Sequence, residues 1–120
     1  LVVIAIIGIL SSVVLASLNT ARTKGADTAV KSNLANIKAQ AELTYSDTVG
    51  YDNVCIDANV MKGLDAASLA GAGNLTSDAC VDSATGWAAS ALLKSSGYWC
   101  VDSTGTSKAE TANTTVTACP

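Results

Sequence analysis

The sequence has no histidine and no phenylalanine, one proline, and only two tryptophans and three tyrosines in 120 residues. Without histidine, the chain lacks the commonest general base and the commonest metal ligand. Seven basic against ten acidic residues give a formal net charge of −3, so we expect no basic patch for nucleic acid. The few aromatic side chains also argue against a surface on which bases stack. Nucleic acid is therefore not predicted as a partner.

Motifs for catalysis are also missing. Serine is abundant, but a nucleophilic serine needs an adjacent base, and no histidine can supply it. No glycine-rich stretch has the spacing of a phosphate-binding loop. The aspartates of the second half are scattered and do not form the spaced oxygen cluster of a defined calcium loop, although a calcium site remains an alternative. We predict that the protein is not an enzyme and has no catalytic, cofactor-binding or metal-binding residues.

No charged residue occurs in the first eighteen positions, LVVIAIIGILSSVVLASL. About 18 apolar residues are enough to cross a bilayer as a helix. The following stretch, 19–45, has no proline and one glycine, and its apolar side chains recur every three or four residues. That spacing marks one face of a helix: Ala26, Val30, Leu34, Ile37, Ala41 and Tyr45. Together the two stretches predict one helix from Leu1 to about Asp47, apolar all round at first and amphipathic afterwards.

Three simpler interpretations of the apolar run remain open. A buried core helix would need more apolar mass than so short a chain can provide around eighteen such residues. A secretory signal peptide has an apolar region of about 7–15 residues that ends at a cleavage site, whereas helix propensity here continues past Ala16 and Leu18. The third interpretation is a single-span anchor of a soluble domain.

The stretch Leu1–Leu10, LVVIAIIGIL, resembles the N-terminal helix of type IV pilins and of the pseudopilins of type II secretion. In that family the mature chain begins FTLIE, with a methylated phenylalanine and a buried glutamate, and a similar apolar run follows. Those residues are absent here, as though the start were missing, so methylation is assigned to no residue. The resemblance implies an α+β fold in which a long N-terminal α-helix packs against a small antiparallel C-terminal β-sheet, stabilised by disulfides.

On this basis the chain divides into a hydrophobic helix segment, 1–24, for the membrane or a filament core, and a globular pilin-like domain, 25–120. The domain would comprise the amphipathic half of the helix (25–47), a variable loop (48–86) and a β-sheet (87–120). Gly50 is a plausible helix cap. Within the loop we expect two short helices or turns, at 57–64 and 65–70. Within the sheet we expect three strands, at 87–93, at 98–103 and inside 106–118.

The four cysteines, all after Val54, suit an oxidising compartment. Four cysteines allow three pairings. Zinc sites usually contain close pairs, whereas the gaps here are 25, 20 and 19 residues between Cys55, Cys80, Cys100 and Cys119. Pilins often close their C-terminal loop with a disulfide, and that resemblance favours Cys100–Cys119, which leaves Cys55–Cys80. Asn74 and Asn113 begin glycosylation triplets and are candidate modification sites.

The resemblance predicts a structural subunit, a pilin, that polymerises into a type IV pilus at the cell surface for adhesion, motility or DNA uptake. Its partners would be copies of itself, the inner-membrane pilus assembly machinery, and the inner membrane before assembly. The filament core would include Leu1, Val3, Ile4, Ile7, Gly8, Leu10, Val14 and Leu18. Two alternatives remain: a pseudopilin of a type II secretion system, and a monomeric membrane-anchored extracellular binding module.

Overall fold

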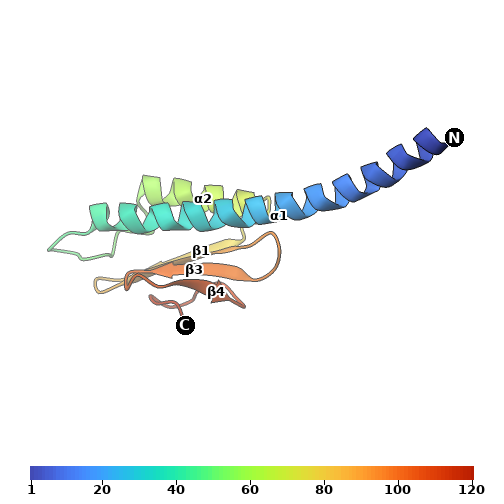
Figure 1. Ribbon diagram of the computed structural model, residues 1–120. Helices are drawn as coiled ribbons and strands as arrows, with labels where there is room; N and C mark the ends of the chain where they lie inside the picture. Colours follow the sequence, from blue (N-terminus) through green and yellow to red (C-terminus); the bar gives the residue numbers. More distant parts are fainter.

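The computed structural model describes residues 1–120 and has the expected α+β fold, with a long N-terminal helix packed against an antiparallel sheet (Figure 1). Its extents are 75 × 24 × 22 Å, because the first part of that helix projects beyond the domain. The elements in chain order are α1 (Val2–Thr44), α2 (Ala58–Gly71), β1 (Asp78–Asp82), β2 (Trp87–Leu92), β3 (Tyr98–Asp102) and β4 (Ser107–Glu110).

Helix α1 is uninterrupted, as the lack of proline predicts, and it ends at Thr44, three residues before the expected Asp47. The prediction of Gly50 as its cap was wrong. Tyr45 is the C-cap residue, and its N–H donates to the carbonyl of Ala41. Gly50 lies beyond the helix with a φ of 62°, where a Cβ would be 1.9 Å from the Ala84 carbonyl oxygen. The glycine is needed for this close approach of two loops.

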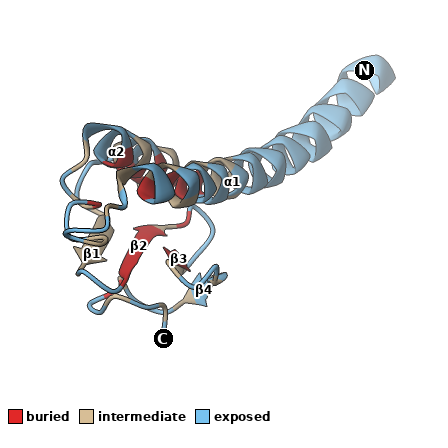
Figure 2. Cartoon of the chain, turned by 90° about the vertical axis from the view of Figure 1, so that its left-hand side faces the viewer, coloured by how far each residue is buried: buried red, intermediate tan, exposed pale blue.

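The apolar stripe of α1 is the centre of the core (Figure 2). Its four central members are at most 1% exposed: Val30, Leu34, Ile37 and Ala41. The sheet covers part of this stripe, in keeping with the predicted packing of the long helix on the sheet. Helix α2 shares that role and contributes Val60 and Leu64 to the same cluster. Burying each large aliphatic side chain stabilises the fold by about 1.5–3 kcal/mol.

Residues 58–71 form one helix, not the two short ones expected inside a variable loop. The carboxylate of Asp57 caps it by accepting from the N–H groups of Asn59 and Val60. Gly63 faces α1, where a Cβ would lie 3.1 Å from Ile37 Cγ1. Gly71 abuts the Leu92 carbonyl at a distance that leaves no room for a Cβ. Both glycines allow α2 to pack closely on its neighbours.

The sheet is antiparallel with strand order β1-β2-β3-β4. Three strands were predicted near their observed positions, but β1 was missed because 78–82 had been placed in the variable loop. The core face of β2 and of the residue that follows it consists of Trp87, Ala89, Ala91 and Leu93. In β3, Trp99 pairs with Ala91 and Val101 with Ala89, so both lie on that face. The opposite face of β3 carries Cys100 and Asp102.

Candidate functional site

The most unusual surface is the first part of α1, where every residue from Leu1 to Leu18 is exposed (Figure 2). The exposed fractions of the large apolar side chains run from 43% at Leu18 to 104% at Leu1. The predicted filament-core residues all belong to this surface and lie on one side of the helix, within about half of its circumference: Leu1, Val3, Ile4, Ile7, Gly8, Leu10, Val14 and Leu18. An apolar surface of this size marks contact with a partner or a lipid bilayer.

By length and composition, α1 is long and apolar enough to cross a membrane, and none of its most apolar stretch is buried in the domain. Such a helix suits a membrane anchor or a signal sequence. The helix stays closed at Gly8, and Ser12 Oγ donates to the Gly8 carbonyl at 2.9 Å. This hydroxyl therefore needs no partner outside its own helix.

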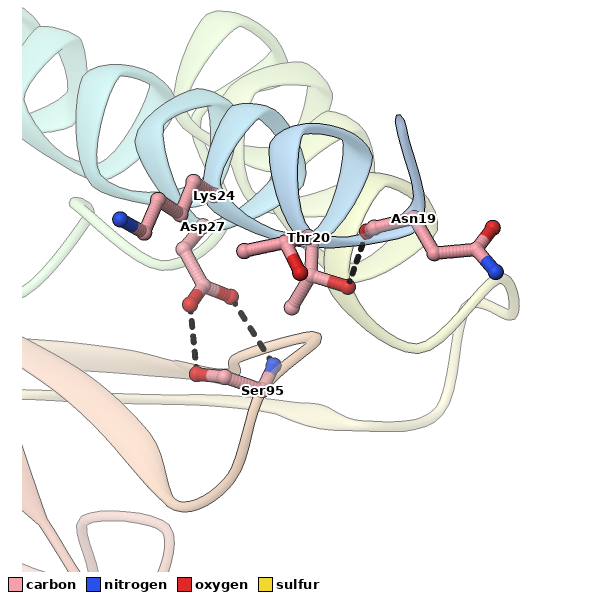
Figure 3. Close-up of a pocket in the computed structure, with 6 residues that line it drawn as sticks. Asn19, Thr20, Lys24, Asp27 and Ser95 are labelled. Carbon is pink, nitrogen blue, oxygen red and sulfur yellow. Dashed lines mark hydrogen bonds between the residues drawn. The ribbon is translucent and has the colours of Figure 1, made fainter. Parts of the chain in front are cut away.

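The helix enters the domain beside an open polar groove of about 520 Å³ (Figure 3). The groove lies between α1 and the loop that joins β2 to β3, and its lining consists of Asn19, Thr20, Thr23, Lys24, Asp27 and Ser95. The carboxylate of Asp27 accepts from the N–H of Ser95 at 3.1 Å and from its Oγ at 2.5 Å. These two bonds join the loop to the helix at the end of the domain that faces the apolar segment.

Lys31 follows Asp27 by four residues on α1 but forms no salt bridge with it. Lys31 Nζ lies 4.4 Å from the centre of the Trp99 ring, a cation–π contact that joins α1 to β3. Burial alone would raise the pKa of Asp27, but the bonds from Ser95, with the nearby charge of Lys31, leave that pKa below its ordinary value. Asp27 therefore serves to hold a loop, and not to pair a lysine.

Both disulfides occur with the pairing that the pilin resemblance favours, Cys55–Cys80 and Cys100–Cys119, and no cysteine is free. The first joins the α1–α2 connection to β1, and the second joins β3 to the C-terminal segment. That segment has no helix or strand after Glu110, so the covalent bond supplies much of its attachment to the sheet.

Removing the Cys100–Cys119 bridge by changing both residues to alanine should lower the free energy of unfolding by about 3 kcal/mol. The reason is the loss of closure of a loop of about 20 residues. Urea denaturation of the variant and the native protein measures the difference, and intact mass without reductant first checks that both bridges exist. Free thiols in the native protein would contradict the pairing, and a loss below about 1 kcal/mol would contradict the stabilising role.

Sequence reasoning missed the role of Asp102, whose side chain is only 2% exposed. One carboxylate oxygen accepts from the N–H and Oγ1 of Thr104 at 3.0 and 2.6 Å, and from the N–H of Thr106 at 3.1 Å. The other accepts from the N–H of Cys119 at 2.8 Å. Asp102 therefore organises the turn that ends at Gly105 and fixes the C-terminal disulfide. The only sequence signal was the turn pattern DSTG at 102–105.

The pKa of Asp102 follows from this environment. Burial would raise the pKa, but the bonds from Thr104, Cys119 and Thr106 bring it below the ordinary value of 3.8. A carboxyl whose folded-state pKa is lowered stabilises the protein above its unfolded-state pKa. This contribution is lost as the pH falls through the folded-state pKa.

Asp102→Asn should therefore lower the free energy of unfolding by about 1–3 kcal/mol at pH 7, and by less at pH 2. Urea denaturation at both pH values tests this expectation. The matched control is Asp52→Asn, since Asp52 is exposed and its side chain makes no hydrogen bond within the protein. Equal losses for Asp102→Asn at the two pH values would show that the carboxylate charge does not matter.

The two glycosylation candidates differ in environment. Asn74 is exposed, and its Oδ1 accepts from the N–H and Oγ1 of Thr76. Asn113 is half-buried, and its Oδ1 accepts from Ser90 Oγ at 2.8 Å, which satisfies a buried serine of β2. Modification at either position stays a prediction, and Asn74 is the more accessible of the two.

No three acidic or cysteine side chains come together in a way that could hold a metal ion. The arrangement offers instead an unburied apolar helix, a disulfide-bonded domain and a polar groove where the two meet. Comparison with known proteins found no matching family model, no matching curated protein and no matching solved structure.

Proposed function

We propose that the protein is a structural subunit, a pilin, that polymerises into a filament of the type IV pilus kind. The observation that carries the proposal is the first part of α1, apolar on every side and uncovered, continuing without a linker into a disulfide-bonded domain. The likeness of Leu1–Leu10 to the pilin N-terminal helix supports the same function, as does the α+β arrangement of helix and sheet.

The physical argument concerns what surrounds this segment. Outside a membrane, eighteen exposed apolar residues require another apolar cover, and copies of the same segment can provide it. Full burial of a leucine, isoleucine or valine contributes about 1.5–3 kcal/mol, so several per subunit can hold a fibre together. The subunit would lie in the inner membrane first and enter the filament with the help of the pilus assembly machinery. The mature filament would stand at the cell surface.

The second candidate is a membrane-anchored monomer, which the span-length apolar helix equally favours. The two functions differ in where the protein is found after cells are sheared without detergent. A pilin appears in the sheared fibre fraction, whereas an anchored monomer stays with the membranes. We expect intact protein in the sheared fraction as a high-molecular-weight polymer. Recovery from membranes alone would overturn the proposal. A pseudopilin is distinguished by short fibres that depend on a secretion system.

A further inference from the structure

Charge is distributed unevenly along the long axis of the molecule. At the end far from the apolar segment, the stretch 39–61 contains four acidic residues and no basic one. We call them the acidic tip: Glu42, Asp47, Asp52 and Asp57. They lie at the end of α1, in the connection to α2 and at the cap of α2 (Figure 1).

The opposite end of the domain carries three exposed cations, which we call the basic collar: Arg22, Lys24 and Lys94. Lys94 comes from the β2–β3 loop, and the bonds between Ser95 and Asp27 place this loop beside the helix residues (Figure 3). Among the acids on this side of the domain, Asp27 is engaged by Ser95. Asp78 is half-buried on β1, where burial and the nearby charge of Asp65 raise its pKa.

Few of these charged side chains form ion pairs or hydrogen bonds within one subunit. The only ion pair joins Lys108 to Glu110 at 3.2 Å, away from both groups. In the tip, Asp57 caps α2 and Glu42 accepts from the Tyr51 hydroxyl at 2.9 Å, while Asp47 and Asp52 make no side-chain hydrogen bond. Two cations are near the tip. Lys62 is exposed on the second turn of α2, and Lys38 lies one turn before Glu42 on α1, where its Nζ donates to Ser107 Oγ at 2.8 Å.

Copies packed parallel and in register would bring collar against collar and tip against tip, which is repulsive. An axial shift brings opposite charges together. Eighteen residues of helix separate Lys24 from Glu42, so the shift is roughly 27 Å at 1.5 Å per residue. We propose that the basic collar of one copy binds the acidic tip of the next copy along the fibre. This inference rests on the proposed function, and it adds the contact that sets the axial order of the subunits.

A charge-swap series in the full chain tests the contact. One variant carries Arg22→Glu with Lys24→Glu, a second carries Asp47→Lys with Asp52→Lys, and a third combines all four changes. The control, Lys38→Glu with Lys62→Glu, changes the net charge as the collar variant does, but outside the collar. Fibre yield after shearing and protein level in the membrane are measured separately for each variant.

We expect the collar and tip variants each to lower fibre yield at least about tenfold, since like charges placed face to face cost several kcal/mol. The combined variant should recover the native yield within about twofold, and the control should change it little. If the native protein forms fibres and every variant gives the native yield, the proposed contact is wrong but the proposed filament still stands. If the native protein forms no fibres, both proposals are wrong. A collar variant that loses membrane level and is not rescued would show that the collar binds anionic lipid headgroups, which also overturns the contact.

Discussion

Replacing Leu10 by lysine is expected to remove fibres almost completely, whereas the same change at Leu75 is expected to leave fibre yield nearly unchanged. The two leucines are equally exposed in the single subunit, at 59% and 54%. They differ in place, because Leu10 lies in the apolar part of α1 and Leu75 lies in the loop between α2 and β1. The same substitution at the two positions therefore tests whether Leu10, unlike Leu75, becomes buried when subunits assemble.

The expected size follows from the cost of a charge in apolar surroundings. A lysine at the centre of an apolar span costs about 2.5–3.5 kcal/mol on insertion scales, and a buried unpaired charge is comparably destabilising. About 3 kcal/mol corresponds to a hundredfold loss or more. Membrane level and sheared fibre should be measured separately, because Leu10→Lys can act at either stage. Normal insertion together with normal fibre yield would contradict burial of the segment in the filament. A monodisperse native monomer in detergent-free solution would contradict it too.

The largest effect on folding is expected at Trp87. Its side chain is 1% exposed and has the largest volume among the fully buried ones. Its neighbours on the core face of β2 are alanines, so no other side chain of that strand can fill the space. Trp87→Ala should lower the free energy of unfolding by about 3–5 kcal/mol, the usual range for removing a buried large aromatic side chain.

Trp87→Phe is the informative companion, because the indole Nε1–H is buried without a hydrogen-bond partner. Phenylalanine keeps most of the apolar volume and removes this unsatisfied donor, so we expect a loss below about 2 kcal/mol. Urea denaturation of both variants gives the comparison. If phenylalanine were as damaging as alanine, the indole N–H would have to make a bond that stabilises the fold.

The parts of the fold that were predicted from sequence are those whose pattern is local. Val30, Leu34, Ile37 and Ala41 repeat at helical spacing without a breaker, and all four are buried. The strand predicted at 87–93 is present as β2, but both of its faces are buried: Ala88 and Ser90 are 0% exposed, as are Ala89 and Ala91. The period of the apolar residues therefore determines the buried face in α1 but not in β2.

The parts that were missed depend on tertiary contacts. Strand β1 is five residues long with aspartate at both ends, and it exists because it pairs with β2 at the edge of the sheet. Residues 58–71 form one helix where two short ones were expected, and packing on α1 brings Gly63 close to Ile37. Asp102 was one scattered aspartate until the fold brought Thr104, Thr106 and Cys119 around it.

The same distinction between local pattern and tertiary contact applies to the candidate site. The apolar segment could be recognised from composition alone, because eighteen uncharged residues need no fold to be identified. The collar could not, since Lys94 is far from Arg22 and Lys24 in sequence. The bonds between Asp27 and Ser95 bring its loop to the helix, and an isolated aspartate and serine carry no signal of that contact.

One consequence follows from the continuity of α1 between the apolar segment and the domain. Because no loop separates them, the helix fixes the rotational orientation of the domain as well as its distance from the apolar segment. One residue inserted between Leu18 and Asp27 would turn the whole domain by about 100° about the helix axis and move it by about 1.5 Å. Four inserted residues would bring it back to within about 40° of its original direction. Changes of length in this part of the chain therefore alter which face of the domain points outward.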